Sequence, residues 1–101
     1  MEICNSKVGK TLTVELKGEL DHHAADRTRA ALDELLKDES INEMILDMRN
    51  VSFMDSSGLG VVLGRYKTVS ARGGKMAITG AGKSVDRIMR MAGVYALIER
   101  R

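Results

Sequence analysis

Apolar and polar residues alternate near the start of the chain, which is the pattern of a strand with one buried face. Leu12, Val14 and Leu16 are separated by polar residues, and this period of two predicts a strand. A weaker strand is expected over 3–8, and Gly9-Lys10 forms a short turn between the two segments. The spacing therefore predicts an N-terminal β-hairpin.

Apolar residues recur at helical spacing in three later segments. The first helix is expected to begin at Asp21, which would serve as its N-cap. The second is expected to begin at Asp55 or Ser56 and to end over 72–74. The third is expected to stop at Gly93. The predicted buried faces are Thr28, Leu32, Leu35 and Leu36; Leu59, Val62, Leu63, Tyr66 and Val69; and Val85, Ile88, Met89 and Ala92.

Short apolar runs between these helices predict the remaining strands. The nearly continuous run over 44–48 is typical of a central parallel strand covered on both faces, and 50–54 is expected to be a connector. Two further strands are predicted over 75–79 and 95–99. The order β-β-α-β-α-β-α-β predicts a single α/β domain over 1–101, with a mixed, mainly parallel sheet, an N-terminal hairpin and helices packed against the sheet.

Residue composition narrows the classes of function. The chain has 101 residues, of which 44% are apolar and 30% charged, as expected for one globular domain. A net charge of +2 and an aromatic fraction of 3% argue against nucleic acid binding. The single cysteine, Cys4, allows no internal disulfide, and no apolar run approaches the ~18 residues of a membrane span. We therefore expect a cytoplasmic protein that does not contact a membrane.

The segment Met54-Asp55-Ser56-Ser57-Gly58-Leu59-Gly60 carries the most informative chemistry. It joins a strand region to the second helix, so Ser56 falls at or near the N-cap. Free backbone N–H groups and the helix dipole favour an anion at that position. A phosphate on Ser56 is therefore compatible with the fold. From these residues alone, a capping serine without regulation is the better interpretation, because serine caps are common.

The second helix also contains three glycines, Gly58, Gly60 and Gly64. A glycine inside a helix costs about 0.5–1 kcal/mol relative to alanine, so such glycines require a reason. One reason is close packing within the domain. The other is a flat surface that admits the backbone of a partner. The spacing alone favours neither explanation.

Other motifs suggest different chemistry. Gly80-Ala81-Gly82-Lys83-Ser84 follows a strand and opens a helix, which makes a small nucleotide-binding domain the alternative function. The complete P-loop motif requires glycine where Ala77 stands, so we favour a helix start with Ser84 as cap and Lys83 in solvent. His22-His23 predicts no metal site, because adjacent side chains on a helix point about 100° apart.

Two basic residues on the second helix, Arg65 and Lys67, are open to two interpretations. They form either a rim for an acidic partner or an ordinary solvated face, and the solvated face is favoured residue by residue.

Two longer segments, 18–23 and 52–67, carry a family resemblance. Together they resemble the STAS domain family, and the predicted order of elements agrees over essentially the whole chain. The Asp-Ser-(Ser/Thr)-Gly-Leu core is shared with general-stress antagonists of that family. The flanking Glu-Leu-Asp-His-His and Gly-Arg-Tyr-Lys sequences favour its sporulation branch, the anti-sigma factor antagonists.

The resemblance implies a regulatory binding protein rather than an enzyme, without a cofactor of its own. Its unphosphorylated form would bind an anti-sigma factor, itself an ATP-dependent serine kinase that carries ATP or ADP, and so release a sporulation sigma factor. Phosphorylation of Ser56 by that kinase would end the binding. A PP2C-type phosphatase would restore it. The free protein is expected to be a monomer.

The resemblance also assigns roles to individual residues. Ser56 matches the phosphoacceptor, Ser57 the second hydroxyl position, and Asp21 and Asp55 the acidic residues beside it. The expected surroundings of the phosphosite and partner surface are Asp21, Asp55, Ser57, Gly58, Gly60 and Gly64. The family continues past its last strand into a C-terminal helix, whereas this chain ends at Arg101. We expect that departure to affect C-terminal packing and not the phosphosite.

Overall fold

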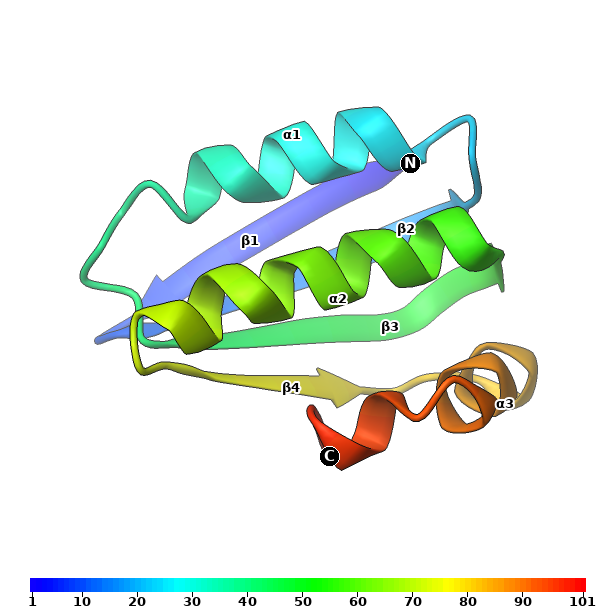
Figure 1. Ribbon diagram of the computed structural model, residues 1–101. Helices are drawn as coiled ribbons and strands as arrows, with labels where there is room; N and C mark the ends of the chain where they lie inside the picture. The colour runs from blue at the N-terminus through cyan, green and yellow to red at the C-terminus, as the bar shows by residue number, and fades with distance from the viewer.

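Five strands form one sheet in the order in which they occur in the chain (Figure 1). The computed structural model describes residues 1–101. The strands are β1 (Glu2–Val8), β2 (Thr11–Leu20), β3 (Glu43–Met54), β4 (Lys75–Thr79) and β5 (Glu99–Arg100). The helices are α1 (Ala25–Leu35), α2 (Ser56–Ala71), α3 (Lys83–Met91) and the short 3-10 helix η1 (Val94–Ala96). Only β1 and β2 pair antiparallel, which confirms the mixed, mainly parallel sheet with its hairpin.

Helices α1 and α2 lie side by side over one face of the sheet (Figure 1). Strands β2, β3 and β4 are parallel and adjacent in chain order. Because crossovers between parallel strands are right-handed, two crossovers that advance in the same direction place their helices on the same face. Neither helix covers the other face, where Thr13, Glu15 and Ile45 are only half-buried, although Asp47 and Ala77 on that face are buried. The prediction that 44–48 is covered on both faces is therefore wrong.

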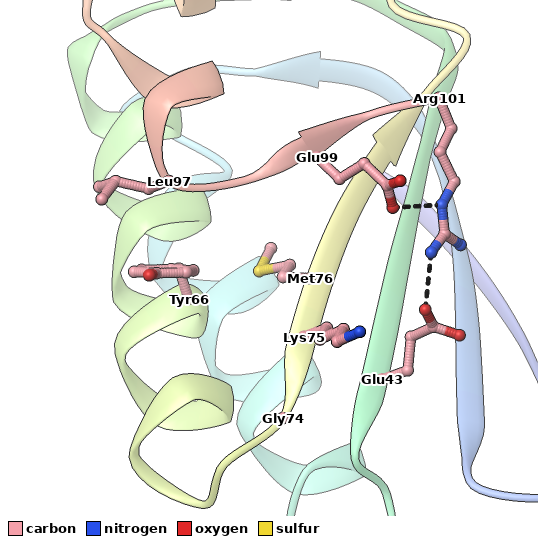
Figure 2. A pocket seen from close by; sticks show the side chains of 8 residues that line it. All are labelled: Glu43, Tyr66, Gly74, Lys75, Met76, Leu97, Glu99 and Arg101. Carbon is pink, nitrogen blue, oxygen red and sulfur yellow. Dashed lines mark hydrogen bonds and ion pairs between the residues drawn. The ribbon is translucent and has the colours of Figure 1, made fainter.

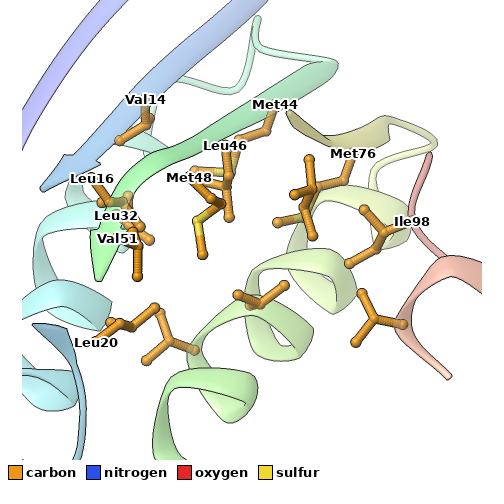
Figure 3. Packing of buried hydrophobic residues seen from close by; sticks show 14 of the residues in the cluster. Val14, Leu16, Leu20, Leu32, Met44, Leu46, Met48, Val51, Met76 and Ile98 are labelled. Carbon is orange, nitrogen blue, oxygen red and sulfur yellow. The ribbon is translucent and has the colours of Figure 1, made fainter. Parts of the chain in front are cut away.

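The hydrophobic core fills the space between the sheet and the helices (Figure 3). Alternate residues of β2, β3 and β4 point into it: Leu12, Val14, Leu16, Met44, Leu46, Met48, Met76 and Ile78. Of the predicted face of the first helix, Thr28, Leu32 and the C-cap residue Leu36 are buried, and Leu35 is half-buried. In α3 the prediction holds for Met89, which is fully buried, but Ala92 is exposed.

The buried face of α2 is rotated relative to the prediction. Val62 and Val69 are buried as expected, but Leu59, Leu63 and Tyr66 are only half-buried. The last three pack only at the margin of the core. Apolar spacing alone could not reveal which face of the helix would be fully buried.

The opposite flank of α2 is buried against α1 instead. Gly58, Val61 and Arg65 belong to this buried face. The Arg65 side chain is only 8% exposed, and its Nε lies 3.0 Å from Oδ1 of Asp33 in α1. Both interpretations of Arg65, as part of a basic rim and as part of a solvated face, are therefore wrong, whereas Lys67 is exposed.

Two segments differ from the predicted elements near strand ends. Residues 50–54, expected as a connector, belong to β3, whose last residue Met54 pairs with Leu20 of β2 after shifts in register. The strand expected over 95–99 is reduced to β5, because residues 94–96 form η1 instead. Both differences arise because pairing depends on the neighbouring strand, which local apolar spacing does not report.

The start of α3 also departs from the prediction. Gly82 occupies the N-cap position and no side chain caps the helix, so Ser84 is not the cap. Lys83 is exposed, as expected for a residue in solvent. No helix in the structure combines the length and the apolar character required to cross a membrane.

The three glycines of α2 are of two kinds. A Cβ atom on Gly58 would collide with the Leu20 carbonyl oxygen and would lie 2.6 Å from Cγ of Met54. A Cβ atom on Gly60 or Gly64 would meet nothing within 4 Å. Close packing therefore explains Gly58, which lets α2 approach the ends of β2 and β3. It does not explain Gly60 and Gly64, which leave the outer side of the helix flat.

A small polar cluster fixes the C-terminal segment to α3. The Tyr95 hydroxyl donates to Oδ1 of Asp86 at 2.7 Å, and the same oxygen lies 3.2 Å from Nε of Arg100. Burial, followed by the hydrogen bond to Asp86, raises the pKa of Tyr95 to about 12. Asp86 is buried, so these hydrogen-bonding and basic partners supply the compensation that a buried polar group requires.

We expect Gly58→Ala to lower the free energy of unfolding by about 1–3 kcal/mol, the usual cost of overpacking a filled site. Gly60→Ala should instead raise it by about 0.5–1 kcal/mol, because alanine favours the helix and the site has room. Urea titrations followed by circular dichroism measure both changes. Equal destabilisation by the two substitutions would contradict the packing described above.

Replacing Tyr95 with phenylalanine removes the donor to Asp86 and keeps the ring. Tyr95→Phe should lower the free energy of unfolding by about 1 kcal/mol at neutral pH. Because the folded pKa is raised, this contribution is present below pH 10 and is lost as the pH rises toward 12. Thermal unfolding curves of the two proteins should therefore converge at alkaline pH. A difference in unfolding temperature that stays constant as the pH rises would contradict the hydrogen bond from Tyr95 to Asp86.

Candidate functional site

Helix α2 begins where two loops meet at one edge of the sheet. Strands β2 and β3 run parallel and end together, with Leu20 paired to Met54. The chain leaves both strands at the same edge: residues 21–24 lead into α1, and Asp55 leads into α2 (Figure 1). The two long motifs noted in the sequence are therefore brought side by side.

Asp55 is the N-cap of α2 and joins the two loops. Its Oδ1 accepts hydrogen bonds from the backbone N–H groups of Ser57 at 2.9 Å and Gly58 at 3.2 Å. Its Oδ2 accepts from the backbone N–H of His22 at 3.0 Å, and the His22 ring Nδ1 lies 3.4 Å from the same oxygen. The cap is thus Asp55 and not Ser56, and one carboxylate holds both segments.

These contacts favour the ionised form of Asp55. Burial alone raises the pKa of this carboxyl group, but hydrogen bonds, first from Gly58 and then from His22 and Ser57, outweigh burial and lower the pKa below its ordinary value. Both carboxylate oxygens therefore serve as acceptors at neutral pH.

Asp21 organises the other loop, although not as the N-cap predicted for α1. Its Oδ1 accepts hydrogen bonds from the backbone N–H groups of His23 at 3.0 Å and Ala24 at 3.1 Å. Helix α1 begins at Ala25, and its N-cap Ala24 has no capping side chain. The prediction is displaced because Asp21 caps the single turn that precedes the helix, and a sequence pattern does not separate such a turn from the helix itself.

Ser56 is the first residue of α2 and is exposed, whereas Ser57 is only partly exposed. The two amide groups that follow Ser56 are already occupied by Asp55. A group attached to the Ser56 hydroxyl would therefore extend into solvent. On the outer side of the same helix, Gly60 is also exposed.

Two residues near this site were not identified from the sequence. Phe53 is 49% exposed at the end of β3, just before Asp55. The chain has few aromatic residues, at 3% of the total. Its sequence alone does not distinguish a phenylalanine on the surface from one in the core. The contact of His22 with Asp55 joins residues 33 positions apart, which no local pattern could predict.

The largest hollow in the structure lies away from Ser56. It has a volume of about 520 Å³, and its polar end is closed by Arg101, which lies 2.7 Å from Glu43 and 2.6 Å from Glu99 (Figure 2). Tyr66 and Leu97 form its apolar side. No group of three or more His, Cys, Asp or Glu residues is placed to hold a metal ion. Ser56, in contrast, does not line this hollow and is exposed on the surface of the protein.

Comparison with known proteins covers nearly the whole chain. The family model of the STAS domain matches residues 4–100. The chain is 42% identical over 87 residues to an anti-sigma F factor antagonist from Paenibacillus polymyxa, and the alignment spans 86% of this chain and 74% of that relative.

Two solved structures of the anti-sigma factor antagonist SpoIIAA are also similar. Its unphosphorylated form matches with a TM-score of 0.78 and 29% identity, over 99% of this chain and 87% of that one. The phosphorylated form, from Bacillus, matches with a TM-score of 0.78 and 27% identity, over 99% and 91%. The fold implied by the sequence motifs is confirmed, and the chain belongs to the STAS domain family.

Proposed function

We propose that this protein is an anti-sigma factor antagonist whose partner binding is switched off by phosphorylation of Ser56. The observation that carries the proposal is the exposed Ser56 at the start of α2, beside an outer helix surface left flat by Gly60 and Gly64. The names of the similar proteins support it, since the relative at 42% identity is an anti-sigma F factor antagonist and SpoIIAA occurs in phosphorylated and unphosphorylated forms.

In the proposed cycle, the unphosphorylated protein binds an anti-sigma factor that is also a serine kinase and carries ATP or ADP. Binding releases the sporulation sigma factor. The kinase then transfers the γ-phosphoryl group of ATP to Ser56: the new oxygen–phosphorus bond forms as the bond to the ADP oxygen breaks, and the hydroxyl proton is released. A PP2C-type phosphatase hydrolyses the phosphoserine to serine and inorganic phosphate.

The physical basis of the switch is the desolvation of charge. A phosphoserine carries about −1.5 to −2 charges at neutral pH. The nearest amides of α2 are occupied by Asp55, so they offer the phosphate little compensation. Removing such a group from water at an interface costs several kcal/mol, and a net loss of about 4 kcal/mol weakens binding about a thousandfold. The acidic side chains of Asp21 and Asp55 add repulsion.

The same geometry explains why the fold would tolerate the modification. Ser56 is exposed and contributes nothing to the hydrophobic core, which lies on the other side of α2. The expected effect of phosphorylation is thus a loss of partner binding without rearrangement of the sheet. The protein would act in the cytoplasm as a kinase substrate and binding module, without enzymatic activity, and as a monomer when free.

Incubation with ATP and the cognate anti-sigma kinase tests the phosphoacceptor. Wild type and Ser57→Ala should each gain the mass of one phosphoryl group, and Ser56→Ala should gain none. Intact-mass analysis distinguishes the three proteins. Phosphate retained on Ser56→Ala and absent from Ser57→Ala would move the site by one residue. Ser56→Asp should bind the kinase more weakly than wild type does, and equal binding would contradict the electrostatic switch.

Enlarging Gly60 tests the flat surface. Gly60→Leu adds a side chain where a Cβ atom meets no neighbour, so the fold should keep its stability. Kinase binding should weaken at least about tenfold, since a bulky side chain would separate the two surfaces. Isothermal titration calorimetry measures the affinity. Ala71→Leu is the matched control, because it is exposed on the same helix but lies at the end remote from Ser56. An equal loss of affinity in both variants would show that Gly60 is not part of the interface.

A further inference from the structure

The Asp55 carboxylate has one oxygen on each of the two loops that form the site. We propose that Asp55 is a positioning residue. It fixes the first turn of α2 against the loop of residues 21–24, which contains His22, and thereby presents Ser56, and not Ser57, to the kinase. This inference rests on the proposed function, because it assigns a cause to the choice of phosphoacceptor at the same site.

The two oxygens have separate tasks. Oδ1 receives the amides of Ser57 and Gly58, and so closes the first turn of α2. Oδ2 receives the amide of His22 at 3.0 Å, in a loop that precedes another helix. The first contact is an ordinary N-cap, which stabilises the helix wherever that helix lies. The second contact fixes the helix start relative to its neighbouring loop.

That second contact matters because helix ends fray. Packing of Gly58 against Leu20 and Met54 holds one side of the first turn, and the contact with His22 supplies a second restraint against small rotations, which would exchange the exposure of adjacent side chains. In the tethered arrangement Ser56 is exposed and Ser57 is only partly exposed. Phosphoryl transfer requires the attacking oxygen to lie in line with the bond that breaks, so a misplacement of about 1 Å is costly. A tethered turn therefore offers the kinase one hydroxyl in one orientation.

Asparagine at position 55 separates the two tasks. Asp55→Asn keeps Oδ1, so the amides of Ser57 and Gly58 retain an acceptor and the helix retains its cap. It replaces Oδ2 with an NH₂ group, which cannot accept from the His22 amide. Asp55→Ala removes both contacts. The matched control is Asp47→Asn, which also removes one negative charge but keeps the Oδ1 acceptor for the Arg49 amide, remote from Ser56.

The experiment measures phosphorylation kinetics, the phosphorylated residue and amide exchange in the same variants. For Asp55→Asn we expect KM in the kinase reaction to rise about tenfold with little change in kcat, because a smaller fraction of the protein presents Ser56 correctly. A measurable share of phosphate should move to Ser57. Hydrogen exchange at the His22 amide should accelerate about tenfold, whereas thermal stability should stay close to wild type. Asp47→Asn should match wild type in phosphorylation kinetics, in the phosphorylated residue and in exchange at the His22 amide.

Three outcomes would overturn the inference. Wild-type KM in Asp55→Asn with phosphate only on Ser56 would show that the tether has no positioning role. An equal rise of KM in Asp47→Asn would assign the effect to charge. A rise of KM accompanied by the same loss of thermal stability as in Asp55→Ala would reduce Asp55 to a helix cap. Phosphate on Ser56→Ala at the wild-type level is a different result, because it overturns the proposed function itself.

Discussion

The parallel pairing of β2 and β3 up to their last residues is the constraint on which the site depends. Leu20 lies beside Met54, so the loops that follow the two strands leave the sheet at the same edge. Gly58 completes the arrangement, because any larger residue would push α2 away from the Leu20 carbonyl group and the Met54 side chain. Because α2 begins this close to the strand ends, the Asp55 carboxylate accepts a hydrogen bond from the His22 amide. This bond joins two loops that are distant in sequence.

Most of the fold could be predicted because its signals are local. A period of two is visible over 11–17, and the α1 positions Thr28 and Leu32 follow the helical period directly. What could not be predicted depends on neighbours. The face of α2 that becomes buried is set by α1, which covers Arg65 and leaves Tyr66 half-exposed. The placement of α1 and α2 on one face of the sheet results from the direction in which successive crossovers advance.

The candidate site likewise has features that follow from a local sequence pattern and others that depend on neighbouring elements. Ser56 and its position at a helix start could be predicted, because a serine between a strand region and an amphipathic helix is a local pattern. Which of the two residues caps the helix could not be predicted, since adjacent Asp and Ser residues are equally good N-caps and only the hydrogen bonds of the folded chain distinguish them. The two explanations of the helix glycines were also open in the sequence, and space around Gly60 separates it from Gly58.

The residues that hold this site together are distinct from those it exposes. Gly58 and Asp55 face inward, toward strand ends and backbone amides, and they determine where α2 begins. Ser56 and Gly60 face outward and contribute little to the core. A charge added to the outward set therefore alters what the surface can bind while the inward set keeps the helix in place. That separation is what a reversible modification requires, because the same scaffold must persist in both states for the switch to be reset.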